Sequence, residues 1–294
     1  MGFPAAKTLD EPSARGAAET ARAVHNATVL GVALAGTWTI AVAIRLLLPR
    51  LLGPQMFGTL YFSEYFAATF FVLISLGVDN YIRKEIATRP EHASEFFGGL
   101  LAIRLAGGLV LVGAIAMVLA MLGRRGLALE LAIVFGVAQI LVTTNLSWAS
   151  LLQAVGEVRG LARLNVAAKI VWGAGIGGGL LVGLPVVVVP ISLFCAEMLK
   201  TAGLFVLSRR HLGLELHVDL RATFAVVVAS LPWFVSGLAR TVYDKVDVSM
   251  LAILASDTEA GWYGAASTIT NVCLLMLPLM VAVVLQVGNS ALSR

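Results

Sequence analysis

Long apolar stretches constrain this sequence more than any other feature. A helix needs about 20 mostly apolar residues to cross the roughly 30 Å of bilayer hydrocarbon. Eight stretches come close to or exceed that length: residues 27–48, 58–80, 98–122, 127–152, 166–184, 186–208, 223–252 and 261–289. They are apolar on all sides, unlike the short alternating strands of a membrane barrel. The sequence therefore predicts an all-α, polytopic membrane protein with about eight transmembrane helices.

Composition excludes a water-soluble domain. Charged residues make up 13% of the 294 residues and hydrophobic residues 59%, whereas a soluble domain carries about 25% charged residues. So few charges cannot cover a surface that faces water. The net charge of +4 is spread over loops between apolar stretches, so we expect membrane lipid and no nucleic acid as a partner.

The basic residues indicate which side of the membrane each loop faces. If the N-terminus is cytoplasmic, twelve lysines and arginines of the tails and loops lie on that side and five on the other. Cytoplasmic loops are normally the ones enriched in these residues. We therefore predict a multi-pass protein of the cytoplasmic (inner) membrane with a cytoplasmic N-terminal arm at residues 1–26.

Two segments separated by about 203 residues resemble each other. In both 52–63 and 254–265 a helix ends at a short turn, and a glycine and aromatic residues open the next helix. Six predicted helices separate the copies, and an even number gives parallel repeats. We therefore expect a six-helix lobe at 27–210, a cytoplasmic linker at 211–222, and the first two helices of a second lobe at 223–294. Chance similarity between two helical hairpins is the alternative.

Several ionisable side chains fall inside the apolar stretches. Each costs about 2.5–3.5 kcal/mol or more near the bilayer centre, so those that occur usually face a cavity or pair with one another. Glu197 and Lys200 are three residues apart, which predicts an ion pair on one helix face. Near helix ends, Arg45, Asp79 and Lys169 have the alternative of reaching the interface. The candidate cavity residues are Arg45, Glu64, Arg104, Glu197, Lys200, Arg240, Asp244 and Asp247.

The stretch 223–252 is too long for a straight crossing and contains Pro232, which removes a backbone hydrogen bond. Downstream, Arg240, Asp244 and Asp247 recur at spacings of four and three, which places them on one face. This pattern favours a hydrated cavity or a polar ligand opposite that face. The alternative is that both aspartates belong to the interfacial end of a shorter helix.

Small residues predict one close helix contact. Gly175, Gly179 and Gly183 recur at every fourth position, a pattern that lets two membrane helices approach closely. Packing within the lobe is favoured over dimerisation. Cys195 and Cys273 lie in apolar runs and are interpreted as small buried residues without a disulfide.

No pattern indicates an enzyme. None of the four histidines has a carboxylate or cysteine at metal-ligand spacing. The sequence also lacks a phosphate-binding Gly-x-x-x-x-Gly-Lys loop and a Gly-x-Ser-x-Gly elbow. We therefore expect no catalytic residues, no metal and no cofactor.

Several short motifs together resemble a known family. Residues 50–58 read Arg-Leu-Leu-Gly-Pro-Gln-Met-Phe-Gly, residues 76–80 read Leu-Gly-Val-Asp-Asn, and residues 82–87 read Ile-Arg-Lys-Glu-Ile-Ala. Later, 230–233 read Ser-Leu-Pro-Trp, Asp247 precedes Leu-Ala-Ile-Leu at 251–254, and 261–266 read Gly-Trp-Tyr-Gly-Ala-Ala. In order and spacing these resemble the polysaccharide biosynthesis proteins, the O-antigen-type flippases of the multidrug/oligosaccharidyl-lipid/polysaccharide exporter superfamily.

The resemblance implies two six-helix lobes around a central cavity, and export of an undecaprenyl-pyrophosphate-linked oligosaccharide by alternating access for O-antigen (lipopolysaccharide) biosynthesis. It implies Arg45 and Arg240 as pyrophosphate candidates, with Arg104 a weaker one. It also implies glycosyltransferases and a polymerase of the same pathway as partners. The departure is length, because the family has about a dozen helices and this second lobe has two, so we expect part of a longer protein.

Two other functions stay open. A multidrug or cation antiporter of the same superfamily would depend on Glu64, Glu197, Asp244 and Asp247 as cation and proton sites. A non-transporting scaffold of envelope assembly would not depend on cavity charges at all.

Overall fold

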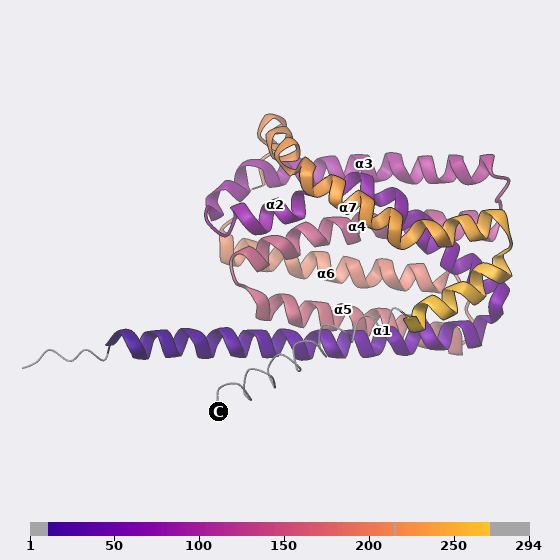
Figure 1. Cartoon of the computed structure of the whole chain (residues 1–294), viewed down its shortest axis with the longest axis horizontal. Coiled ribbons are helices and arrows are strands. Elements are labelled where there is room, and N and C mark those ends of the chain that lie inside the picture. Colours follow the sequence, from indigo (N-terminus) through magenta and orange to yellow (C-terminus); the bar gives the residue numbers. More distant parts are fainter. Residues whose placement is uncertain (1–10, 215, 271–294) are drawn as a thin grey trace, which may run out of the picture.

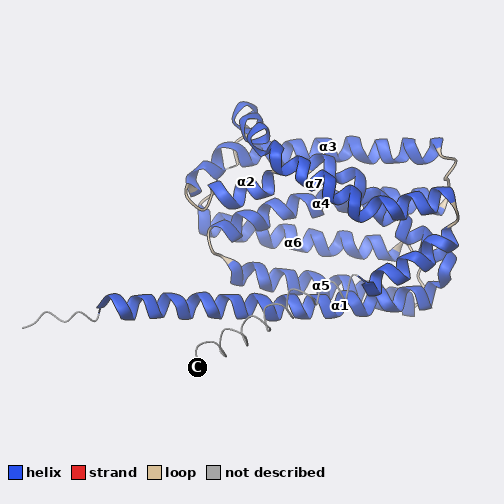
Figure 2. Ribbon diagram, viewed as in Figure 1, coloured by secondary structure: helices blue, strands red, loops and turns tan. Residues whose placement is uncertain are grey.

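The computed structural model describes residues 11–214 and 216–270, with side chains from Gly36 onward apart from Val242, Asp244 and Lys245. All regular structure in these residues is helical (Figure 2). The order is α1 (Glu11–Phe71), η1 (Val72–Ile74), α2 (Val78–Glu85), η2 (Pro90–His92), α3 (Ala93–Met121), α4 (Leu127–Ala154), α5 (Val158–Leu181), α6 (Val188–Leu212) and α7 (Leu220–Leu254). Helical backbone resumes over 257–270.

Six segments of the described residues are long and apolar enough to cross a membrane: Gly36–Ile74, Pro90–Met121, Leu127–Ala154, Val158–Leu181, Val188–Leu212 and Leu220–Thr241. The first covers most of two predicted helices, 27–48 and 58–80, which are joined across a kink. The eighth prediction, 261–289, lies mostly outside the described residues. The chain is therefore a polytopic all-α membrane protein, as predicted.

The kink inside α1 lies at Gly53, whose φ of 72° and ψ of 167° are not helical. Glycine adopts a positive φ without steric penalty, and the next residue, Pro54, has no backbone N–H to donate. The two halves of α1 therefore fold back on each other at this end of the molecule (Figure 1).

The predicted helix at 58–80 is interrupted, which corrects the sequence-based boundary. Helix α1 ends at Phe71, a 3₁₀ turn follows, and Leu76 and Gly77 both have positive φ, of 53° and 66°. Two consecutive left-handed residues cannot continue a right-handed helix. Gly77 also lies directly on α7, because a Cβ there would be 2.4 Å from the backbone nitrogen of Phe234. This break therefore contacts α7 two residues beyond Pro232.

Helix α5 begins at Val158 rather than at residue 166. Its N-cap residue is Glu157, whose carboxylate accepts a hydrogen bond from the backbone N–H of Gly160 at 3.2 Å. Arg159 and Arg163 occupy its first turns, and charged residues of this kind are invisible to a search for apolar runs. The helix is therefore longer than its apolar part.

Helix α4 lies at the centre of the bundle and packs against α1, α3 and α6 (Figure 1). One buried cluster includes Phe62 and Phe135. The other includes Phe97 and Trp148, whose ring centroids are 4.6 Å apart. These two clusters fix the helices that position the charged residues described below.

The glycine pattern packs α5 against α6 within the chain. A Cβ at Gly175 would lie 2.5 Å from the Ser192 hydroxyl, and one at Gly179 would lie 2.5 Å from Val188. Gly183 has a φ of 82° and lies beyond the end of α5 at Leu181. It therefore does not extend the contact between α5 and α6. The predicted burial of Cys195 is wrong, because this free cysteine is exposed on α6. Cys273 lies outside the described residues.

Candidate functional site

A small cavity of about 80 Å³ lies among α1, α4, α5 and α6. Its wall combines apolar and charged side chains, although every contributing helix belongs to a segment apolar enough to span a membrane. The lining residues are Arg45, Leu48, Phe57, Leu60, Tyr61, Glu64, Phe135, Lys169, Trp172, Val189 and Leu193. Two predicted candidates, Arg45 and Glu64, are among them.

Arg45 and Glu64 form an ion pair across the two halves of α1. The guanidinium Nη2 is 2.8 Å from the Glu64 carboxylate, and the side chains are 33% and 27% exposed. The fold at Gly53 brings these residues together, although they are 19 positions apart in sequence. Arg45 therefore lines the cavity instead of reaching the interface, the alternative considered from sequence.

Lys169 is a cavity residue that sequence reasoning assigned to the membrane interface. Its ammonium lies 3.8 Å from the ring centroid of Trp172, a cation–π contact. Among the described side chains no carboxylate lies within 4 Å of it. Trp172 follows three residues later on the same helix face, which was the signal available in the sequence. With Arg45, Glu64 and Lys169 charged, the described wall carries one excess positive charge.

A second polar cluster connects α4 and α6. Asn145 is buried and donates to the Glu197 carboxylate at 2.7 Å, while Thr201 donates to the Asn145 amide oxygen at 2.9 Å. Lys200 lies 4.0 Å from Glu197. The predicted Glu197–Lys200 pair is thus confirmed. Asn145 was missed because a single asparagine in an apolar run gives no periodic signal.

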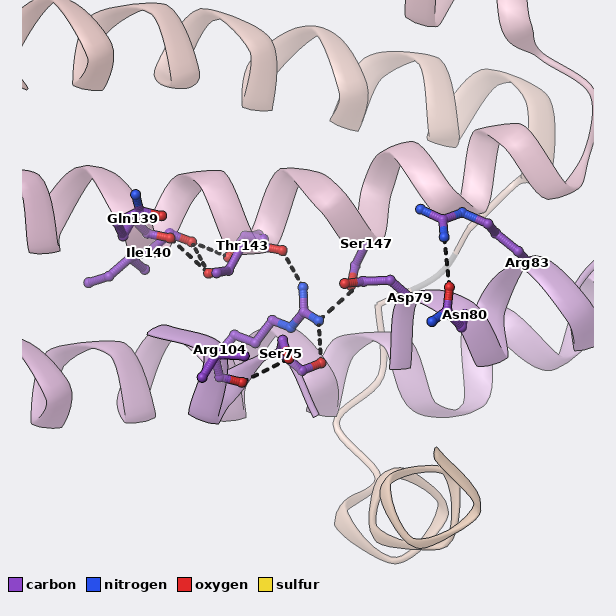
Figure 3. A network of polar contacts seen from close by, with 11 residues as sticks. Ser75, Asp79, Asn80, Arg83, Arg104, Gln139, Ile140, Thr143 and Ser147 are labelled. Carbon is purple, nitrogen blue, oxygen red and sulfur yellow. Dashed lines mark hydrogen bonds and ion pairs between the residues drawn. The ribbon is translucent and has the colours of Figure 1, made fainter. Parts of the chain in front are cut away.

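Arg104 lies in a different network, shown in Figure 3. It is 0% exposed, and it donates to Asp79 at 3.1 Å, to the Ser75 carbonyl at 2.9 Å and to the Thr143 carbonyl. Ser147 donates to the same Asp79 oxygen at 2.5 Å. Asp79 is therefore paired with Arg104 instead of lying free at the interface, and Arg104 does not line the cavity around Arg45.

The predicted charged face of α7 is only partly described. Arg240 is exposed and is not among the residues that line the Arg45 cavity. Asp247 accepts hydrogen bonds from the Tyr263 hydroxyl and from the backbone N–H of Val248, the latter at 2.8 Å. The side chain of Asp244 lies outside the description. A substrate-binding role for these residues stays a prediction.

An ion pair joins the α3–α4 turn to the turn after α7. Arg124 donates to the Asp257 carboxylate and to the Ala252 carbonyl, and its guanidinium lies 4.8 Å from the Phe62 ring centroid. Asp257 also accepts from Thr59 of α1 at 2.8 Å. We call these contacts of Arg124, Asp257, Ala252 and Thr59 the terminal clasp.

Beside the terminal clasp, the two repeat-like segments cross with almost no space between their backbones. A Cβ at Gly58 would lie 2.9 Å from the Gly261 nitrogen, and one at Gly261 would lie 3.2 Å from the Gly58 nitrogen. The nearest carbonyl oxygens belong to Asp257 and Pro54, respectively. A shift of 203 residues converts each set of contacts into the other, as a two-fold axis would. The division into lobes itself stays a prediction.

Comparison with known proteins identifies the family but gives no individual relative. A family model described as polysaccharide biosynthesis protein matches residues 23–285. No curated protein and no solved structure shows a significant match. Because the family match extends over nearly the whole helical bundle, the chain belongs to the polysaccharide biosynthesis protein family.

Proposed function

We propose that this chain belongs to a transporter that flips an undecaprenyl-pyrophosphate-linked oligosaccharide across the cytoplasmic membrane by alternating access. In this proposal it is not an enzyme. It receives its substrate from glycosyltransferases and delivers it to a polymerase for O-antigen assembly. Membership in the polysaccharide biosynthesis family and the apolar helical bundle support a membrane role in that pathway.

The observation that carries the proposal is the cavity with its excess positive charge. A lone cation in an apolar segment costs at least about 2.5–3.5 kcal/mol, so it needs water or an anionic partner. The lining contains two cations, Arg45 and Lys169, and one carboxylate, Glu64, which pairs with Arg45. A pyrophosphate entering this space would neutralise the excess charge, and arginine binds phosphate oxygens in bidentate fashion.

The carboxylates fit a cation antiporter less well. Glu64 is paired with Arg45, Glu197 is held by Asn145 and Lys200, and Asp247 accepts two hydrogen bonds. A cation site would need carboxylate oxygens that are not already neutralised by neighbouring cations. The described charges therefore favour an anionic substrate.

Orientation is part of the same proposal. The turns at Gly53, Gly123–Gly126 and Gly183 lie at one end of the helices, whereas Arg83, Arg159 and Arg209 lie at the other. We assign the arginine-rich end to the cytoplasm because such residues are enriched on that side. Reporter fusions after Arg125 and after Arg210 test it: the first is expected to report outside and the second inside.

The decisive experiment measures surface polysaccharide in cells that depend on this protein. Lys169→Met, Arg45→Met and Arg240→Ala are expected to abolish export and to accumulate lipid-linked oligosaccharide in the inner leaflet, at normal protein levels in the membrane. Arg125→Ala is the control, because Arg125 is exposed in the α3–α4 turn away from the cavity.

Normal export by both the Lys169→Met and Arg45→Met variants would refute the role of the cavity. Loss of cation or drug efflux in Glu64→Gln and Glu197→Gln, with intact polysaccharide export, would favour the antiporter. Unchanged transport in every charge variant, together with loss of a bound envelope protein, would favour a scaffold.

A further inference from the structure

An apolar groove of about 420 Å³ runs along the outer surface of α5 and α6, away from the charged cavity. Ala202 and Gly203 form its floor and leave the groove open because they have little or no side chain, and Leu164 lies so close that a Cβ at Gly203 would be 2.3 Å away. Leu199 and Val206 border the floor and are 44% and 46% exposed. Nothing in the described chain fills this space.

The groove is charged at one end only. Arg210 and His211 line it in the last turn of α6, and no acidic residue lines it. Arg210 is exposed, and the His211 Nδ1 lies 3.8 Å from the Glu157 carboxylate. His211 therefore already has an anionic partner, which leaves Arg210 as the cation directed at a ligand in the groove.

The length of the groove matches one leaflet. From Leu199 to Arg210 the helix rises 11 residues, or about 16 Å at 1.5 Å per residue. Half of the bilayer hydrocarbon is about 15 Å. The groove therefore reaches from the interface at Arg210 to about the middle of the membrane, the distance covered by one acyl chain.

We propose that this groove is a binding site for an anionic phospholipid of the leaflet on the Arg210 side. One acyl chain lies on Ala202 and Gly203 between Leu199 and Val206, and the phosphate accepts hydrogen bonds from the Arg210 guanidinium. An arginine suits a phosphate because its planar fork donates two parallel hydrogen bonds. A cation near the surface also favours anionic headgroups over zwitterionic ones.

Arg209 provides a matched control. It lies in the same helical turn but faces a neighbouring groove, with its guanidinium 5.7 Å from the Phe205 ring centroid. General attraction of anionic lipid to basic residues would depend on both arginines equally. A site built at the groove depends on Arg210 and tolerates Arg209→Gln.

The experiment is native mass spectrometry of the purified full chain in detergent, with phosphatidylglycerol or phosphatidylcholine added at equal concentration. The chain is expected to retain one phosphatidylglycerol about tenfold more strongly than phosphatidylcholine. Arg210→Gln is expected to remove this preference. Ala202→Phe fills the groove and is expected to remove retention of both lipids. Because Ala202 is exposed, that variant should keep its circular dichroism and elution volume.

Four results would overturn the proposal. Equal retention of both lipids by the unmodified chain would mean no headgroup site. Equal losses in Arg209→Gln and Arg210→Gln would mean general electrostatic attraction. Full competition by inorganic phosphate would mean that the ligand is a soluble anion. A dimer that disappears in Ala202→Phe would assign the groove to a second copy and would refute the lipid site as well. None of these readouts depends on oligosaccharide transport.

Discussion

Reversing one charge of the terminal clasp is expected to open the bundle at the end assigned to the outside. In Arg124→Asp the side chain can no longer donate to Asp257 or to the Ala252 carbonyl. Two carboxylates then face each other, while Thr59 keeps its hydrogen bond to Asp257. The contact between α1 and the turn after α7 therefore changes from attraction to repulsion.

The magnitude follows from the partial exposure of the pair. A charge-assisted hydrogen bond contributes about 1.5–3 kcal/mol, and side chains that are 21% and 26% exposed belong at the lower end of that range. Losing about 1.5 kcal/mol changes the ratio of closed to open molecules roughly tenfold. The double exchange Arg124→Asp with Asp257→Arg restores the ion pair. It does not restore the bond to the Ala252 carbonyl, because aspartate cannot donate.

The assay follows the accessibility of a cysteine placed just inside the crossing of the two segments. Leu60 is 2% exposed and lies two residues after Gly58, so Leu60→Cys is introduced after both native cysteines are replaced by alanine. A membrane-impermeant maleimide is expected to label it about tenfold faster in Arg124→Asp, and at an intermediate rate in the double exchange. Arg125→Asp is the control. Unchanged labelling in Arg124→Asp, or no recovery in the double exchange, would refute the role of the clasp.

Further predictions concern the helix contacts, measured as apparent melting temperature in detergent. Arg104→Met leaves Asp79, whose side chain is 17% exposed, without its cation, and is expected to cost about 3 kcal/mol, the lower end of the range for breaking a buried ion pair; a change no larger than that of an exposed arginine variant would contradict this. Gly77→Ala is expected to prevent stable folding because of its positive φ and its contact with α7, so normal yield would argue against that packing. Gly179→Val is expected to destabilise, whereas Gly178→Val, with open space around it, is not; equal effects would exclude the α5–α6 contact as the cause.

The helices could be predicted because a chain in lipid must satisfy every backbone hydrogen bond within a helix or a closed barrel. The interruption at Leu76 and Gly77 could not, since hydropathy contains no information about φ. A glycine in an apolar run was the available signal, and the sequence contains many that are simply helical.

The candidate site was predictable residue by residue but not as an arrangement. Arg45 and Glu64 were each identified from the cost of a charge in hydrocarbon. Their pairing depends on the sharp fold at Gly53, which the sequence indicates only as a turn. Glu197 and Lys200 were predicted as a pair because their spacing alone brings them together. Arg104 and Asp79 lie 25 positions apart. Their pairing could not be predicted from spacing, because it depends on how α3 packs against the helix interruption at residues 72–77.

The crossing of Gly58 and Gly261 also determines the order in which the chain can assemble. These residues are 203 positions apart, and at 5–20 residues per second their synthesis is separated by about 10–40 s. During that interval the Gly58 surface of α1 is without its final partner, and Arg124, once synthesised, is without Asp257 for a further 133 residues. The first helices therefore complete this contact only after all the intervening helices have inserted, which makes this crossing a late step of biogenesis.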